Sequence, residues 1–114
     1  MQPLLTSDQL DAVMAAPVAL VFKHSTRCPV STAAYHEVQA LLRERPDAPV
    51  WIVDVIAHRR LSLEVEGRTG VVHESPQAIV LAAGEVLWDG SHFEVKAEAL
   101  ARELEQAEAG ADRA

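Results

Sequence analysis

The chain has 114 residues, of which 49% are hydrophobic and 24% are charged. This composition is typical of a soluble globular protein, and we expect residues 1–114 to form one domain that folds without a disulfide or a structural metal. The formal net charge of −7 argues against nucleic acid as a partner, because neutralising phosphates requires a basic surface.

Cys28 is the only cysteine, so an intramolecular disulfide is excluded. Any redox cycle at this residue must pass through a mixed disulfide with a small thiol or with another protein. The longest apolar stretch, residues 12–22, is too short to cross a bilayer, and the N-terminus does not resemble a signal peptide. We therefore expect no membrane partner and a cytoplasmic location, where thiols are kept reduced.

The first half of the chain predicts a short helix followed by a strand–helix–strand unit. Thr6-Ser7-Asp8-Gln9 has the spacing of a capping box, and the helix that it opens should stop before Pro17. Two apolar runs without alternation indicate strands buried on both faces, and between them apolar residues recur with helical spacing. These predicted elements are residues 7–16, 17–23, 30–45 and 50–56.

The second half predicts a short helix, a hairpin and a last helix. The stretch 58–66 is weakly patterned but predicts a short helix, and the glycines of residues 67–70 should end it. Two short strands, 78–82 and 85–88, are close enough to form an antiparallel hairpin.

The last helix is predicted from a second capping box, formed by Ser91 and Glu94. Its apolar face should begin at Phe93, and the chain should fray over residues 110–114. The residues predicted for that face are Phe93, Ala97, Leu100, Leu104 and Ala107.

The order of these elements joins a βαβ half to a ββα half around a mixed central sheet of about four strands, flanked by helices. This is the α/β arrangement of a thioredoxin-like fold. In open α/β sheets, functional groups lie beyond the carboxyl ends of the parallel strands. Cys28 follows the first core strand, so we expect it at that edge.

The surroundings of Cys28 favour a reactive thiol. Pro29 suits the first helical position, because its missing N–H would have no partner there, and this puts Cys28 at the N-cap. The helix dipole and the free N–H groups of Val30 and Ser31 would then face the sulfur and stabilise the thiolate. The alternative, a small buried apolar side chain, is the usual fate of an isolated cysteine but fits this context less well.

Four neighbours of Cys28 are candidates for a supporting role. Arg27, Lys23 and, if protonated, His24 would add positive potential near the thiolate. Ser31 would offer a hydroxyl from the position that a second cysteine occupies in Cys-x-x-Cys. The alternatives are a solvated lysine at a strand end and an ordinary serine in a first helical turn.

The stretch Glu74-Ser75-Pro76-Gln77 precedes the third core strand and is a candidate for substrate binding. A cis Ser75–Pro76 bond would make a tight turn and leave the backbone of Ser75 free to pair with an extended substrate. The pattern alone favours the alternative, a trans proline that starts an edge strand. Metal-ligand spacing is absent from the histidines, so we expect no metal site.

Two segments resemble the monothiol bacilliredoxin family, thioredoxin-like proteins of bacteria that use bacillithiol. They are residues 22–31, with Lys-His-Ser-Thr-x-Cys-Pro-Val-Ser, and residues 73–77. The resemblance implies that Ser31 stands where dithiol relatives have a resolving cysteine. It also implies that Pro76 is the cis-proline of the fold and sits against the active-site cysteine. Arg27 departs from the family pattern, in which a neutral residue is more usual.

The resemblance further implies an enzyme whose co-substrate is bacillithiol, with no metal and no bound prosthetic group. Cys28 would attack the bacillithiol sulfur of an S-bacillithiolated client protein and release that protein reduced. Free bacillithiol or another reductant would then remove the adduct from Cys28. The alternative is a thioredoxin-like binding or redox-sensor module whose Cys28 is capped by a small thiol without efficient turnover.

Overall fold

The computed structural model describes residues 1–112. Its centre is a five-stranded sheet with the strand order β1-β3-β2-β4-β5. Strands β1, β3 and β2 run parallel, whereas β4 is antiparallel to both β2 and β5. The strands are β1 (Gln2–Pro3), β2 (Ala19–His24), β3 (Val50–Asp54), β4 (Gln77–Ala82) and β5 (Glu85–Ser91).

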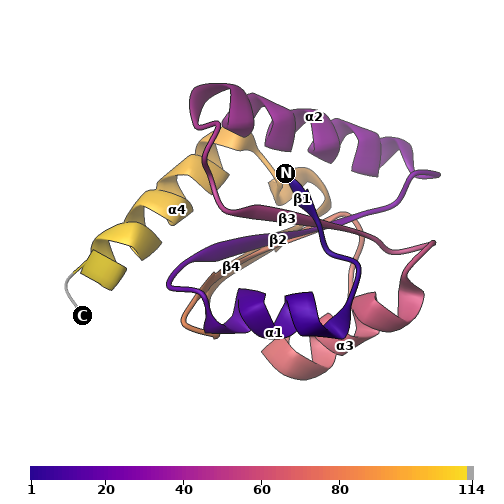
Figure 1. The fold of residues 1–114 in the computed structure, drawn as a ribbon. Coiled ribbons are helices and arrows are strands. Elements are labelled where there is room, and N and C mark those ends of the chain that lie inside the picture. The colour runs from indigo at the N-terminus through magenta and orange to yellow at the C-terminus, as the bar shows by residue number, and fades with distance from the viewer. Residues whose placement is uncertain (113–114) are drawn as a thin grey trace.

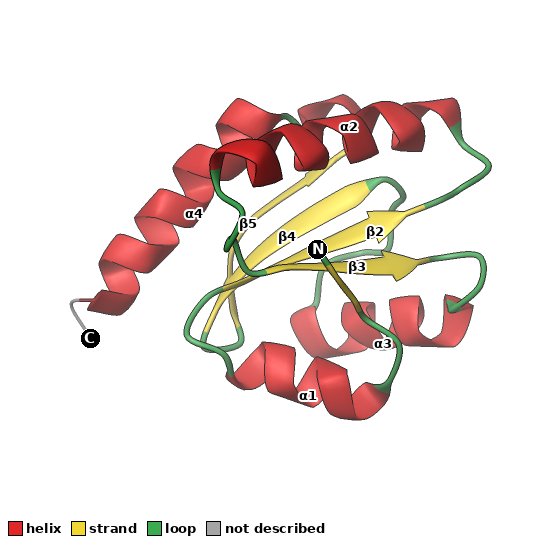
Figure 2. Cartoon of the chain, turned by 45° about the horizontal axis from the view of Figure 1, so that its top comes forward, coloured by secondary structure: helices red, strands yellow, loops and turns green. Residues whose placement is uncertain are grey.

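Four α-helices cover the two faces of this sheet, α2 and α4 on one face and α1 and α3 on the other (Figures 1 and 2). No helix within residues 1–112 is both long and apolar enough to span a membrane. The helices are α1 (Ser7–Ala15), α2 (Pro29–Glu44), α3 (Arg59–Thr69) and α4 (Ala97–Asp112), with a 3-10 helix, η1 (His92–Glu94), before the last.

The core is divided into two layers by the alternation of side chains along β2. Leu20 and Phe22 pack with residues of α2 and α4, whereas Ala19 and Val21 pack with residues of α1 and α3. All four side chains are buried, as expected for a central strand covered on both faces. The residues that end β2 therefore project toward different helices.

At the start of the chain, the predicted capping box is confirmed, and the structure has one strand that was not predicted. The side chain of Thr6 accepts the N–H of Gln9 at 3.1 Å, and Gln9 Oε1 accepts the N–H of Thr6 at 3.2 Å. Strand β1 has only two residues, which is too short for any periodic pattern. It accounts for the fifth strand, one more than expected.

The prediction that α3 ends before Gly67 is wrong. The helix continues through Gly67 to Thr69 and ends at Gly70, whose φ of 77° is left-handed. A glycine inside a helix costs about 1 kcal/mol relative to alanine, and burial of Leu61 and Val65 against the sheet outweighs that cost.

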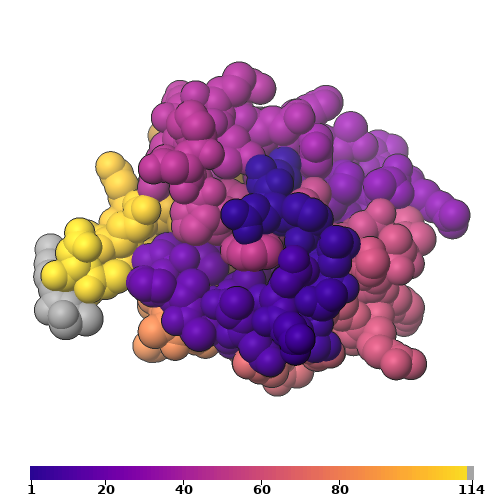
Figure 3. All heavy atoms as spheres, in the orientation of Figure 1, coloured from indigo at the N-terminus to yellow at the C-terminus, as the bar shows by residue number. Residues whose placement is uncertain are grey.

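The second capping box forms, but it caps η1 rather than the last helix. His92 has a φ of 54°, and α4 starts only at Ala97, so Phe93 is 69% exposed instead of lying in the core. The predicted fraying is wrong for residues 110–112, which are helical, and residues 113–114 lie outside the described part. The C-terminal end of α4 projects from the body of the molecule (Figure 3).

The predicted hairpin between β4 and β5 is confirmed, with β5 extending to Ser91. Its two-residue turn, Ala83-Gly84, has positive φ at both positions (49° and 81°), which is the pattern of a type I′ turn. Ala83 donates its N–H to the carbonyl of Ala16 at 3.0 Å, so the turn is tied to the end of α1.

Candidate active site

Cys28 lies in the turn between β2 and α2, at the carboxyl edge of the parallel strands. Its backbone is extended (φ −111°, ψ 121°) at the N-cap of α2, and Pro29 follows at the start of the helix, as predicted. The carbonyl of Cys28 accepts the N–H of Thr32 at 3.0 Å, the first hydrogen bond of the helix. The thiol is free and partly exposed, which excludes the alternative of a buried apolar side chain.

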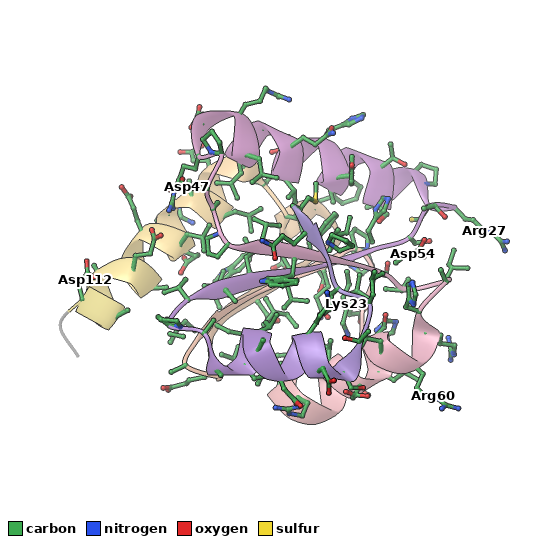
Figure 4. All side chains as sticks on the ribbon, in the orientation of Figure 1. Lys23, Arg27, Asp47, Asp54, Arg60 and Asp112 are labelled. Carbon is green, nitrogen blue, oxygen red and sulfur yellow. The ribbon has the colours of Figure 1, made fainter. Side chains whose placement is uncertain are left out.

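The sulfur makes no capping hydrogen bond, so the N–H groups of Val30 and Ser31 could stabilise the thiolate only through the field at the helix start. Sulfur is a weak acceptor, and the Cys28 side chain instead lines a shallow surface pocket of about 360 Å³. Figure 4 shows Arg27 extending into solvent at this end of the molecule. The pocket is lined by Thr26, Arg27, Cys28, Pro29 and Thr32.

Ser31 is completely buried, and its hydroxyl is hydrogen-bonded to groups at the end of β2. Its Oγ accepts the N–H of Ser25 at 2.8 Å and lies 2.9 Å from Nδ1 of His24. Since the Oγ already accepts one hydrogen bond, its own proton can be donated to Nδ1 of a neutral imidazole. Ser31 therefore joins the end of β2 to the first turn of α2.

His24 is neutral near neutral pH. Burial lowers the pKa of His24 below its ordinary value, and the carboxylate of Asp54 opposes this shift only in part. The imidazole packs against the rings of Phe22 and Tyr35, with centroid distances of 5.6 and 5.0 Å. The suggestion that a protonated His24 adds positive potential does not fit this setting.

Asp54 and Tyr35 border His24 and were not identified from the sequence. Asp54 ends β3 opposite His24 in the parallel register. Hydrogen bonds from the N–H groups of Ala57 and Ile56 lower the pKa of Asp54 and keep it ionised. Cys28 was located by the rule that functional groups lie at the carboxyl ends of parallel strands. Asp54 ends the parallel strand β3, so the same rule could have identified it.

Lys23 lies on the other face of the sheet from His24. Its side chain is completely buried, and Figure 4 places it inside the molecule, on the side of α1 and α3. Its Nζ lies 3.0 Å from Nδ1 of His73. Burial lowers the pKa of Lys23 to about 8, although Glu66 opposes the shift. Lys23 is therefore neither the solvated lysine nor the neighbour of the thiol that the sequence suggested.

The Ser75–Pro76 peptide bond is cis, which is the geometry implied by the family resemblance. The carbonyl of Pro76 accepts the N–H of His92 at 2.9 Å, so this turn is fixed against the end of β5. In the antiparallel register of β2 and β4, Lys23 is opposite Gln77. Pro76 therefore lies at the same end of the sheet as His24 and the turn that carries Cys28.

Gln77 is not available for substrate, contrary to the prediction. The residue is 1% exposed, and its Nε2 donates to the carbonyl of Val72 at 2.9 Å. Ser75, by contrast, is partly exposed just before β4. Within residues 1–112, no group of three or more histidine, cysteine, aspartate or glutamate side chains is arranged to hold a metal ion.

The chain matches known proteins along most of its length. The sequence model of the family described as monothiol bacilliredoxin BrxC matches residues 2–100. A solved structure described as a candidate oxidoreductase with a thioredoxin fold is 34% identical, with a TM-score of 0.83 and coverage of 90% of this chain and 91% of that chain.

Two more distant structures confirm the predicted thioredoxin-like fold. Mitochondrial thioredoxin 3 from Saccharomyces cerevisiae is 14% identical, with a TM-score of 0.73 and coverage of 93% of this chain and 94% of that chain. A thioredoxin mutant from Halobacterium salinarum is 21% identical, with a TM-score of 0.73 and coverage of 93% and 88%. The family match and the 34% identical oxidoreductase structure support a thiol redox role. Because the family model matches residues 2–100, the chain belongs to the monothiol bacilliredoxin family.

Proposed function

We propose that this chain, acting as one cytoplasmic domain, removes bacillithiol from S-bacillithiolated client proteins through a mixed disulfide at Cys28. The observation that carries the proposal is a single, partly exposed thiol at the start of α2. Such a thiol has no resolving partner within the chain, so any adduct that it accepts must leave with an external thiol. The family match supports bacillithiol as that thiol.

The reaction consists of two thiol–disulfide exchanges. In the first, the thiolate of Cys28 attacks the bacillithiol sulfur of the client's mixed disulfide. A new disulfide joins Cys28 to bacillithiol, and the client cysteine leaves as a thiolate. In the second, the thiolate of free bacillithiol attacks the bacillithiol sulfur held by Cys28. Bacillithiol disulfide is released, Cys28 returns to its thiolate, and the two electrons that reduced the client come from bacillithiol.

The local structure supports the thiolate of Cys28 in two ways. The first-turn N–H groups of α2 and the helix dipole place positive potential at the N-cap. Arg27 adds a formal positive charge next to the cysteine, and Pro29 starts the helix without an N–H of its own. Because Arg27 is exposed, its contribution should decrease as the salt concentration rises.

The turn at Ser75 and Pro76 supports binding of an extended client segment. Within residues 1–112, the backbone of Ser75 forms no hydrogen bond. An extended peptide could therefore pair with the N–H and C=O of Ser75 as a short additional strand. The side chain of Ser75 does not need to contact the client in this arrangement.

The proposal is tested by intact mass spectrometry after mixing the protein with an S-bacillithiolated protein of different mass. We expect the adduct to move to the wild-type chain and to leave it on addition of free bacillithiol. The Cys28→Ala variant should leave the adduct on the client. An adduct that stays on the client in the presence of wild-type protein would overturn the proposal. An adduct that reaches Cys28 but resists free bacillithiol would identify a capped redox sensor instead.

A further inference from the structure

The segment between α3 and β4 is held by polar side chains from three neighbouring elements. This segment, residues 71–76, has no helix or strand and leads into the cis Ser75–Pro76 bond. Nζ of Lys23 lies 3.0 Å from Nδ1 of His73, and Glu66 accepts the N–H of His73 at 2.6 Å. Gln77 donates to the carbonyl of Val72 at 2.9 Å. We call Lys23, Glu66 and Gln77 the clamp residues.

The clamp residues converge because of the sheet register and the place of α3. Lys23 and Gln77 are opposite each other in neighbouring strands, so their side chains project to the same face. Helix α3 covers that face and brings Glu66 to the same segment. Three separate elements, β2, β4 and α3, therefore hold two consecutive residues, Val72 and His73.

Burying the ammonium group of Lys23 costs desolvation free energy, which indicates a role beyond packing. Lys23 is 0% exposed and forms no ion pair with a carboxylate within residues 1–112. An apolar side chain of similar length would fill the same space without desolvating an ammonium group. The interaction that distinguishes lysine from such a side chain here is its contact with His73.

The charges around this contact favour an ammonium that donates to a neutral imidazole. Burial and then the neighbouring ammonium of Lys23 lower the pKa of His73, whereas Glu66 and Glu74 oppose the shift and Arg59 adds to it. Near neutral pH, Nδ1 of His73 therefore accepts a hydrogen from Lys23. A hydrogen bond with an ionised donor is stronger than a neutral one.

We propose that Lys23 is a positioning residue, which fixes His73 from inside the molecule and thereby holds the Ser75–Pro76 turn where a client segment pairs with it. The assignment of that turn to client binding rests on the proposed function. The hydrogen bond between Lys23 and His73 is present in the free protein, so it does not depend on the proposed function. The two can therefore be tested separately.

The first test measures amide hydrogen exchange of the free protein by mass spectrometry. Lys23→Met keeps an unbranched apolar side chain but removes the donor, and Lys96→Met is the matched control at the exposed second lysine. We expect exchange of the His73 N–H, which is bonded to Glu66, to be faster by on the order of tenfold in Lys23→Met, the effect of losing one charged hydrogen bond. Lys96→Met should exchange like the wild type. Unchanged exchange in Lys23→Met would overturn the proposal.

A second pair of variants changes His73, the acceptor of the same hydrogen bond. His73→Gln keeps a side-chain acceptor, whereas His73→Leu removes it. Slow exchange of the backbone N–H at residue 73 should be retained in His73→Gln and lost in His73→Leu. Equal exchange in the two variants would contradict a hydrogen bond to Lys23 as the restraint.

The functional test compares two reactions of Cys28 in the same variants. Iodoacetamide is small and does not need the Ser75–Pro76 turn, so its rate should stay within about twofold of wild type in Lys23→Met. Transfer from an S-bacillithiolated protein should show a higher KM. Equal losses in both reactions would mean that Lys23 acts on the thiolate and would overturn the positioning role. Failure of wild-type transfer would refute the proposed function, while hydrogen exchange would still decide on the contact.

Discussion

The residues next to Cys28 divide into those that border the thiol and those that build the framework beneath it. Arg27 and Pro29 line the surface pocket with the cysteine. Ser31 Oγ is hydrogen-bonded to Nδ1 of His24 and accepts the N–H of Ser25, so these groups join the end of β2 to α2. Proximity in the sequence therefore does not identify a residue that touches the sulfur, because a helix start turns successive side chains in different directions.

Replacement of Ser31 by alanine tests its framework role. The N–H of Ser25 and Nδ1 of His24 would lose their partner, so we expect the free energy of unfolding to fall by about 1–3 kcal/mol. Thr32→Ala, at an exposed neighbouring position, should have a smaller effect. Urea denaturation measures both changes. A large fall in the alkylation rate of Cys28 in folded Ser31→Ala would instead favour the hydroxyl as a direct donor to the thiolate.

The titration of Lys23 should be visible in the pH dependence of stability. The pKa of Lys23 is lowered from 10.5 to about 8 by folding, so between these values the unfolded chain binds more protons than the folded protein. The free energy of unfolding contributed by this group should therefore rise as the pH increases from about 8 to 10.5. Below pH 8 both states are protonated, and the desolvation cost is present in full.

Denaturation in urea at pH 7.5 and pH 10, values that bracket most of this range, measures the effect. The rise should be absent in Lys23→Met and present in Lys96→Met. A rise of equal size in both variants would show that other groups cause it.

Among the elements, the hairpin turn between β4 and β5 is the one most constrained by backbone geometry. Gly84 has a φ of 81°, and a Cβ atom at this position would lie 2.9 Å from the carbonyl oxygen of Met14. The turn therefore needs glycine both for its left-handed backbone and for its close approach to α1. Ala83, with a φ of 49°, adopts the same region without a glycine.

Gly84→Ala should reduce the free energy of unfolding by more than about 1 kcal/mol, because the new side chain meets both the unfavourable backbone region and the Met14 carbonyl. Gly67→Ala is the matched control, since a Cβ there would meet nothing within 4 Å and lie inside α3. That control should be more stable than wild type by up to about 1 kcal/mol. A similar loss in both variants, measured by thermal denaturation, would contradict the special requirement at Gly84.

At the scale of the whole molecule, the features that the sequence predicted correctly are those with a local cause. A capping box needs only Thr6 and Gln9, and the start of α2 follows from Cys28 and Pro29. Periodic apolar residues located the central strands and α2, since burial depends on alternation or helical spacing within a short window. The thioredoxin-like fold followed from the order of these elements.

The features that could not be predicted depend on pairing between distant residues. Gln77 reads as a loop residue in the sequence, but the β2–β4 register places it inside the protein opposite Lys23. Glu66 reaches His73 only because α3 lies on that face. Ser91 and Glu94 form the predicted box, but the positive φ of His92 separates it from α4. No local pattern contains this information.

The opposite orientations of Lys23 and His24 also bear on how strand β2 finds its place during folding. A shift of β2 by one residue would send every side chain of the strand to the other face. The ammonium of Lys23 would then enter the apolar layer beneath α2 and α4, and His24 would lose Ser31. The rest of β2 is apolar and could pair in several alignments with similar free energy. Lys23 and His24 therefore distinguish the native alignment from alignments shifted by one residue.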